Sequence, residues 1–380
     1  MLSEPTYLAA RMVASTIENH FAKHITAARV FSDLNLSRDL SARIIEAVID
    51  VAFWASLRRE EGKPPKISMA LLHPSQSEQP LLFENRIRLT PQNLIKLAPA
   101  VEQPGIHLGI WHEEDDIYIW GTTNSIPGIC FVLEVVEPGL LVIKHKRIDG
   151  FGKFVNIAIL KGDEIKIVDE ETSGVGDCPS LLTSLLGLPL PSSTEEGVNV
   201  LVELASSMRS HGRGGILLIV PQGSATWRNS IVQPMNYPVT PAYTVITNLM
   251  QMDLEERDTL EWQEALLDAI KVIGGFTAVD GATVITDQHE LMAFGAKIAR
   301  SENSVPVEQL IVTEPVVDGK ATRRHPAQNG GTRHLAAAQF VHDQHDALAL
   351  VASQDGHFTV FSWSNQLNLV HAHKIDILLL

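Results

Sequence analysis

The fold of the second half of the chain is decided by residues 214–220, GGILLIV. This apolar run is unbroken, whereas a strand with one solvated face alternates apolar and polar residues. It therefore predicts a central strand that is covered on both faces. Helical periodicity over residues 198–208 and 260–273 supports an α/β arrangement. Further strands are predicted at residues 276–279, 283–286, 347–352 and 357–362.

The first half of the chain has a different pattern. Residues 4–59 carry apolar residues at helical spacing, and residues 67–169 contain short strand-like runs separated by turn sequences. We expect an α+β domain, with helices and an antiparallel sheet, over residues 1–175. A segment rich in glycine and proline predicts a linker over 176–194. We expect an α/β domain with a mixed central sheet flanked by helices over 195–380.

Composition narrows the class of protein. The chain has 380 residues and a formal net charge of −15, which repels nucleic acid phosphates, so we expect no nucleic acid partner. Its two cysteines, Cys130 and Cys178, are too few for a disulfide framework or a cysteine-based zinc site. We find no signal peptide pattern and no apolar stretch of bilayer length, so we expect a cytoplasmic protein with no membrane partner.

The common phosphate-loop, dinucleotide and nucleophile-elbow motifs are absent from the α/β half. Three other features there contain residue types that serve in catalysis or ligand binding. The first is Asp280-Gly281-Ala282, between two apolar runs. The second is GGTRHLAA at residues 330–337, which contains Thr332, Arg333 and His334. The third is a strand that ends in Ser353-Gln354-Asp355.

Each feature has a chemical and a purely structural interpretation. Asp280 at a tight turn can hold a divalent metal beside a close backbone approach, but an Asp-Gly pair is also an ordinary hairpin turn. Arg333 offers a fork that suits phosphate, but a basic loop can also be solvated surface. Ser353 and Asp355 follow a buried strand, where α/β sheets place ligands, although a hairpin explains them equally.

In order and context, the three features together resemble the diadenylate cyclase domain. That family carries Asp-Gly-Ala, then Gly-Thr-Arg-His-Arg-Ala-Ala, then a strand ending in Val-Ser-Glu-Glu. Residues 200–220 resemble its opening helix and strand, and the resemblance covers roughly residues 195–365. It implies a metal-dependent nucleotidyltransferase that joins two ATP molecules into cyclic di-AMP and releases two pyrophosphates. The N-terminal half resembles, more loosely, the sensor modules that precede such domains.

The resemblance implies roles in catalysis and metal binding for some residues. Asp280 would bind the metal and help to activate the attacking 3′-hydroxyl, and Asp355 would be the second acidic metal ligand. Arg333 and His334 would be catalytic residues that hold the triphosphate together with Thr332. The expected ion is Mg²⁺ or Mn²⁺, because oxygen ligands dominate the site.

The resemblance also implies how the substrate binds. Gly281 and Ala282 would approach the nucleotide through their backbone, Thr332 would hold the triphosphate with Arg333, and Ser353 would contact phosphate. Two such domains would meet face to face, each presenting one ATP, so a homo-oligomer is expected.

The chain departs from the family's pattern in the second and third motifs. Leu335 stands where the family has a second arginine, and Gln354 and Asp355 stand where it has paired glutamates. The stretch between Ala282 and Thr332 is also longer than usual. It contains Arg323 and Arg324, which we hypothesise to replace the missing arginine in ATP binding.

Two alternatives belong to other classes of protein. Leu335 and Gln354 favour a catalytically degenerate nucleotide-binding sensor, and a structural protein would use the three motifs only as turns. A separate metal site is a weaker hypothesis, because it lacks a third well-spaced ligand. Its candidate residues are His342, Asp343, His345, Asp346, His371 and His373.

Overall fold

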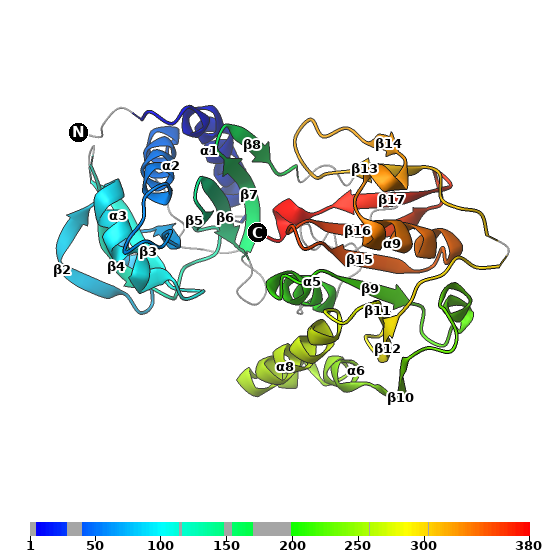
Figure 1. Cartoon of the computed structure of the whole chain (residues 1–380). Coiled ribbons are helices and arrows are strands. Elements are labelled where there is room, and N and C mark those ends of the chain that lie inside the picture. Colours follow the sequence, from blue (N-terminus) through cyan, green and yellow to red (C-terminus); the bar gives the residue numbers. More distant parts are fainter. Residues whose placement is uncertain are drawn as a thin grey trace. The chain divides into compact units, whose positions relative to one another are not determined.

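The chain divides into two compact units in a computed structural model that describes residues 5–28, 40–113, 116–147, 154–169, 199–257, 259–302 and 304–380 (Figure 1). The N-terminal unit consists mainly of residues 1–168 and the C-terminal unit mainly of residues 169–379. The predicted linker over residues 176–194, which includes Cys178, lies outside the described residues.

The N-terminal unit combines helices with one sheet, as the sequence predicts. Its described helices are α1 (Leu8–Ala28), α2 (Ala42–Ser56) and α3 (Pro91–Leu97). Its strands are β1 (Ile67–Leu71), β2 (Leu81–Arg88), β3 (His107–Glu113), β4 (Asp116–Thr123), β5 (Phe131–Glu137), β6 (Leu140–Lys146), β7 (Phe154–Lys161) and β8 (Glu164–Ile167).

These described strands form a sheet in the order β2-β4-β3-β1-β5-β6-β7-β8. All pairs are antiparallel except β1 with β3, which are parallel. The sheet is therefore not purely antiparallel, because the chain passes through β2 and α3 before β3 returns beside β1. Helices α1 and α2 bury Ile17, Phe21 and Ile49 against one face of the sheet.

The C-terminal unit is built on a larger mixed sheet. Its described helices are α5 (Val200–Ser210), α6 (Val245–Met250), α7 (Leu254–Arg257), α8 (Leu260–Phe276) and α9 (Thr332–Asp343). Its strands are β9 (Gly215–Val220), β10 (Tyr237–Tyr243), β11 (Ala282–Thr286), β12 (Leu291–Ala296), β13 (Leu310–Thr313), β14 (Thr322–Arg324), β15 (Leu348–Ala352), β16 (Phe358–Ser364) and β17 (Leu369–Lys374).

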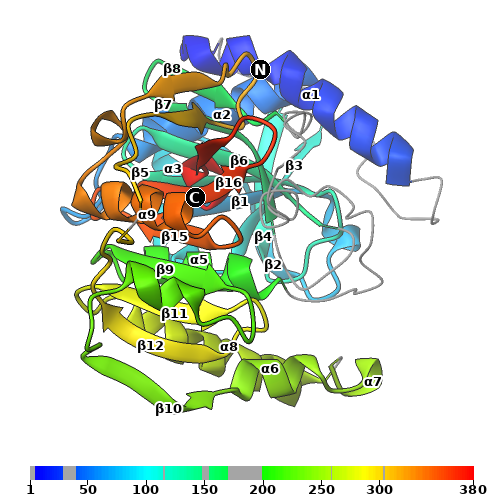
Figure 2. The same ribbon diagram turned by 90° about the vertical axis from the view of Figure 1, so that its right-hand side faces the viewer.

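The described strands of this sheet run in the order β10-β12-β11-β9-β15-β16-β17-β13-β14, and those from β10 to β15 can be followed side by side in Figure 2. Strand β9 is parallel to β11 and antiparallel to β15. Strands β13 and β17 form a second parallel pair. The predicted mixed sheet with a buried central strand is thus what the structure contains.

Helices cover both faces of this sheet, which explains the unbroken apolar run in β9. Helix α9 packs Ala337, Phe340 and Val341 onto one face, against Ile216 and other residues of the same core cluster. Leu217 on the opposite face is buried as well. Helices α5 and α8 pack together outside the α9 cluster, and α5 contacts β15, so these helices cover that face.

One predicted strand is wrong. Residues 276–279 belong to the end of α8 and the turn after it, because the helix continues to Phe276. The Thr277 hydroxyl donates to the carbonyl of Gly274 at 2.6 Å and ends the helix there. The Thr277 carbonyl lies so close to Gly215 that a Cβ at Gly215 would be 2.2 Å from it. Tertiary packing of this turn on β9 therefore overrides a local preference for strand.

None of the helices in the described part of the chain is long and apolar enough to cross a bilayer.

Candidate functional site

The three sequence features come together at one end of the C-terminal sheet. Ala352, the last residue of β15, pairs with Gly215, the first residue of β9, because these two strands are antiparallel. Ala282, the first residue of β11, pairs with Ile216 of β9 because these two strands are parallel. The turn before β11, the start of β9 and the turn after β15 therefore lie on adjacent strands, spaced about 4.8 Å apart.

Arg333 reaches this end of the sheet from α9. A Cβ at Gly214 would lie 3.0 Å from Nη1 of Arg333 and 3.1 Å from the carbonyl oxygen of Ala352. The guanidinium thus packs over bare backbone between β9 and β15. Gly214 has φ of +72°, a conformation that favours glycine. Both the lack of room for a Cβ and the backbone conformation therefore suit glycine at this position. Arg333 is half-buried, whereas Thr332, the first residue of the helix, is exposed.

The N-terminus of α9 adds backbone donors beside Arg333. Gly331 is the N-cap and provides no side-chain acceptor for the first N–H groups of the helix. Unsatisfied N–H groups at a helix N-terminus favour an anion. This end of α9 therefore combines a guanidinium with backbone N–H groups, a combination suited to phosphate oxygens.

The Asp280 turn is shaped by close backbone packing. Asp280 is exposed, and Gly281 has φ of +105°. A Cβ at Gly281 would lie 2.5 Å from the carbonyl carbon of Gly295 on β12, so no larger residue fits. Ala282 is fully buried in the core. As the first residue of β11, it has its backbone at the end of the sheet. The turn presents the Asp280 carboxylate to solvent at this end of the sheet.

The Ser353 feature is a tight hairpin between β15 and β16. The Ser353 hydroxyl accepts from the N–H of His357 at 3.1 Å, and the Ser353 N–H donates to the His357 carbonyl at 2.8 Å. Gln354 and Asp355 are exposed at the tip. Asp280 and Asp355 therefore offer exposed carboxylates at the same sheet end, the kind of donor that Mg²⁺ or Mn²⁺ takes.

His334 lies beneath this surface. It is 5% exposed, and its Nε2 lies 3.3 Å from the hydroxyl of Thr359 on β16. Burial, followed by the nearby charge of Lys374, lowers the pKa of His334 to about 4. The ring is therefore neutral at pH 7 and does not supply a cation to phosphate. Its packing under Gly330 indicates that it positions the start of α9.

Several residues at this sheet end carry no sequence signal of their own. Arg213, just before β9, is exposed, and its N–H donates to Nδ1 of His211 at 3.1 Å. The other ring nitrogen of His211 then donates to Thr277 at 3.0 Å, which ties the start of β9 to the turn after α8. Lys374, at the end of β17, adds another cation. These residues could have been assigned to the site only with knowledge of the strand register.

An aromatic stack lies beside the Asp280 turn. The ring of Phe294 on β12 stacks on Tyr237 with centroids 4.9 Å apart and on Phe276 at 4.5 Å. Tyr237 also lies against Gly295, the residue that contacts Gly281. Tyr237 is 49% exposed, so one aromatic surface near the turn faces solvent. Such a surface suits a planar base.

Arg323 and Arg324 are not brought to this site. They are exposed on β14, the edge strand, four positions from β15 in the sheet order. At about 4.8 Å per strand, this places them roughly 19 Å from β15. The structure therefore gives no support to the hypothesis that they replace the family's second arginine, and Leu335, which stands in that arginine's place, is 43% exposed.

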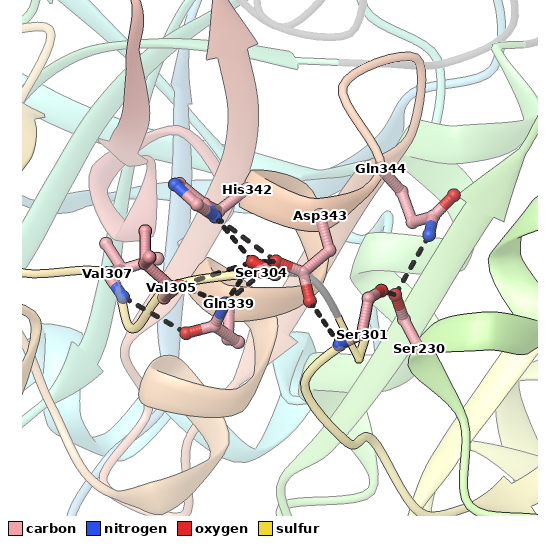
Figure 3. Close-up of polar contacts among 9 residues, drawn as sticks. All are labelled: Ser230, Ser301, Ser304, Val305, Val307, Gln339, His342, Asp343 and Gln344. Atoms are coloured by element: carbon pink, nitrogen blue, oxygen red, sulfur yellow. Dashed lines mark hydrogen bonds and ion pairs between the residues drawn. The ribbon is translucent and has the colours of Figure 1, made fainter.

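The alternative metal residues near the other end of α9 are engaged in a hydrogen-bond network instead (Figure 3). The side chain of Asp343 has no exposed surface. It accepts from the N–H of Ser301 at 2.8 Å, from Gln339 at 2.8 Å, and from the Ser304 hydroxyl. Burial raises the pKa of Asp343, but the hydrogen bonds together lower it by more. The net pKa therefore lies below the usual range of an aspartate.

The histidines of that hypothesis are also accounted for by packing. His345 stacks on Trp363 with ring centroids 3.7 Å apart. His371 and His373 are buried on β17, stacked at 3.8 Å, and both lie within hydrogen-bond distance of the Thr313 hydroxyl. Hydrogen bonding and packing thus account for Asp343, His345, His371 and His373 without an ion.

The comparison with protein families concerns the N-terminal unit. Residues 36–124 match a family model described as "Probable sensor domain DACNV", which covers less than a quarter of the 380-residue chain. The matched range includes α2 and β1 to β4. This part of the chain is thus similar to a sensor domain, in agreement with the sensory role expected for the N-terminal half. The curated proteins contain no match to the chain.

Proposed function

We propose that the C-terminal unit is a diadenylate cyclase and that the N-terminal unit is the sensor that regulates it. One observation carries the proposal. The Asp280 turn, Arg333 and the Ser353 hairpin are far apart in the sequence, yet they lie on adjacent elements at one end of the sheet. Unrelated turns have no reason to converge in this way, whereas a nucleotide site requires it.

Each element has a task in binding ATP. Arg333 and the N–H groups of α9 hold the triphosphate, and Arg213 and Lys374 add positive charge. Gly281 lets the backbone approach the nucleotide, and the Tyr237 ring stacks on the adenine. Positioning and charge neutralisation of this kind supply most of the catalysis in phosphoryl transfer.

The reaction needs a metal and two sites. Asp280 and Asp355 are the residues that would hold Mg²⁺ or Mn²⁺, which would neutralise charge on the phosphates and on the departing pyrophosphate. The 3′-hydroxyl oxygen of one ATP bonds to the α-phosphorus of the other, the bond to pyrophosphate breaks, and the hydroxyl proton is released. The reciprocal transfer closes the ring, so two copies of the domain face each other.

The test is incubation of the purified chain with ATP and Mn²⁺ or Mg²⁺, with products separated by chromatography and identified by mass. We expect cyclic di-AMP and pyrophosphate from the wild type. Asp280→Asn, which keeps the size of the side chain but loses its charge, should bind ATP and form no product. Equal product from this variant would contradict the assignment of Asp280.

A degenerate sensor is the second candidate, and the exposed Leu335 and Gln354 favour it. Both occupy positions where the resembled family has charged residues, and both face solvent at or beside the site. ATP binding without product, in the full chain and in residues 195–380 alone, would favour this candidate. Product from the shorter chain only would mean that the N-terminal unit inhibits the cyclase.

A further inference from the structure

Three histidines meet in the N-terminal unit, outside the range that matches the sensor family. His20 and His24 are four residues apart on α1 and so share one face of that helix. His145 comes from β6. One ring nitrogen of each histidine lies within 4.8 Å of the others. The ring centroids are 4.3 Å, 5.5 Å and 5.3 Å apart for the three pairs.

The packing of α1 on the sheet fixes this meeting point. Phe21, which is 1% exposed, lies between the two helix histidines and packs on Phe131 and His145. His145 is 5% exposed, whereas His20 and His24 are only half-buried. The site therefore has one ligand, His145, that is fixed on the sheet. The other two, His20 and His24, lie at the solvent side, where an ion can enter.

The chemistry of His145 suits a metal ligand. Its Nδ1 lies 3.0 Å from the carbonyl oxygen of Lys146, and because a carbonyl only accepts, Nδ1 carries the proton. Nε2 then carries the lone pair that a metal ion can bind. Histidine ligands usually have such a hydrogen bond on the other ring nitrogen, which fixes the tautomer and the ring orientation.

The two lysines that flank His145 in the sequence point away from the cluster. Side chains alternate between the two faces of a strand, so His145 shares the α1 face of β6 with Leu141 and Ile143. Lys144 and Lys146 belong to the opposite face, where Lys144 pairs with Glu134 at 2.6 Å and Lys146 donates to a backbone carbonyl. An ion among the three imidazoles is therefore not opposed by these lysines.

We propose that His20, His24 and His145 bind a divalent transition-metal ion of the zinc class, as a site of the N-terminal unit. Around a tetrahedral ion with bonds of about 2.0–2.1 Å, ligand nitrogens are about 3.4 Å apart. Small rotations of the half-buried His20 and His24 reach this spacing. Three imidazoles without a carboxylate select zinc-class ions over Mg²⁺ or Ca²⁺ and leave a fourth position open. This inference does not rest on the cyclase activity.

The test uses the full-length chain and two probes, Zn²⁺ and Co²⁺. We expect one high-affinity Zn²⁺ per chain in the presence of excess Mg²⁺, a rise in the melting temperature of the N-terminal unit, and the visible absorption of tetrahedral Co²⁺. His24→Ala, at a half-buried position that tolerates the change, should weaken this site by about 100-fold or more. His20→Ala should behave in the same way.

Matched variants separate this site from incidental binding by other histidines. Asn19→Ala alters an exposed neighbour on the same helix, and His112→Gln removes a half-buried histidine outside the cluster. Both should bind Zn²⁺ as the wild type does. Asp280→Asn should do so too, even if it abolishes product formation. Wild-type affinity in folded His20→Ala and His24→Ala, or no Zn²⁺ bound by the wild type, would overturn the proposal.

Discussion

Gly214 is the residue on which the geometry of Arg333 depends. Its missing side chain creates the space in which the guanidinium lies, between the start of β9 and the end of β15. An arginine fork binds phosphate well only when it is held in one orientation, because its advantage over lysine is geometric. The first glycine of the central apolar run thus has a consequence for ligand binding that its sequence context does not reveal.

Gly214→Ala should therefore impair nucleotide binding more than folding. The new Cβ would lie 3.0 Å from Nη1 of Arg333 and force the guanidinium to move. We expect ATP affinity to fall by roughly 10- to 100-fold, the equivalent of losing one or two charge-assisted hydrogen bonds. Titration calorimetry with ATP measures this effect.

Gly223→Ala is the matched control. Gly223 has φ of +75°, close to the +72° of Gly214, but nothing lies within 4 Å of its Cβ position. The backbone strain of alanine, about 1–2 kcal/mol, is therefore common to both variants. Equal ATP affinity in the two variants would mean that Gly214 does not position Arg333 for binding.

His334 makes the stability of the C-terminal unit depend on pH. Its pKa is about 4 in the folded chain and about 6.5 when unfolded, so the unfolded chain binds the extra proton between these values. The contribution of His334 is fully present above pH 6.5 and is lost as the pH falls towards 4. Its size is on the order of 3 kcal/mol.

We expect His334→Gln to flatten this dependence. Thermal melts between pH 7 and pH 4.5 should show a smaller loss of melting temperature for the variant than for the wild type. His345→Gln, which removes an exposed histidine of the same unit, should retain the wild-type slope. An unchanged slope in His334→Gln would mean that the ring is not held neutral by its surroundings.

At the scale of elements, α9 is fixed at both ends. Its first turn carries Arg333 at the site, and its last turn carries Asp343, which binds Ser301 and Ser304 of a connecting loop. A helix held at its far end keeps its N-terminus in register with the sheet. The Asp343 network therefore has a structural role that supports the site from a distance.

Asp343→Asn should release the connecting loop. An amide can replace one accepting oxygen but brings a donor towards the Ser301 N–H, so we expect a loss of about 2 kcal/mol. The exposed Lys297 and Arg300 next to the loop should then be cut faster by trypsin. Asp346→Asn, an exposed change three residues away, should leave the cleavage rate unchanged. If Asp343→Asn is also cut at the wild-type rate, the network does not hold the loop.

The hydrophobic pattern predicted where helices and strands lie better than it predicted which strands pair with each other. The runs in β9 and α8 are long enough to be recognised, and the motif residues Asp280, Arg333 and Ser353 stand out by type and order. The parallel pair of β1 and β3, and the edge position of β14, depend on which strands pair, which local pattern does not encode. For that reason the sequence suggested Arg323 and Arg324 and could not suggest Arg213 or Lys374.

At the scale of the whole molecule, the chain combines an acidic surface with a local basic site. The formal net charge is −15, yet Arg213, Arg333 and Lys374 gather at one end of one sheet. We expect the general field to repel large polyanions such as nucleic acid, and we propose that the local cations and helix N–H groups attract a small triphosphate. The proposed nucleotide ligand is consistent with this distribution of charge.

The proposed product joins two ATP molecules and so requires two copies of the site, which can be tested by mixing. When wild type is allowed to exchange with an equal amount of Asp280→Asn, about half of the wild-type chains should pair with an inactive partner. Cyclic di-AMP formed per wild-type chain should fall to about half. Mixing with Arg323→Ala/Arg324→Ala, which changes residues away from the site, should cause no loss. An output that is unaffected by Asp280→Asn would mean that a single copy completes the reaction, and the face-to-face arrangement would have to be abandoned.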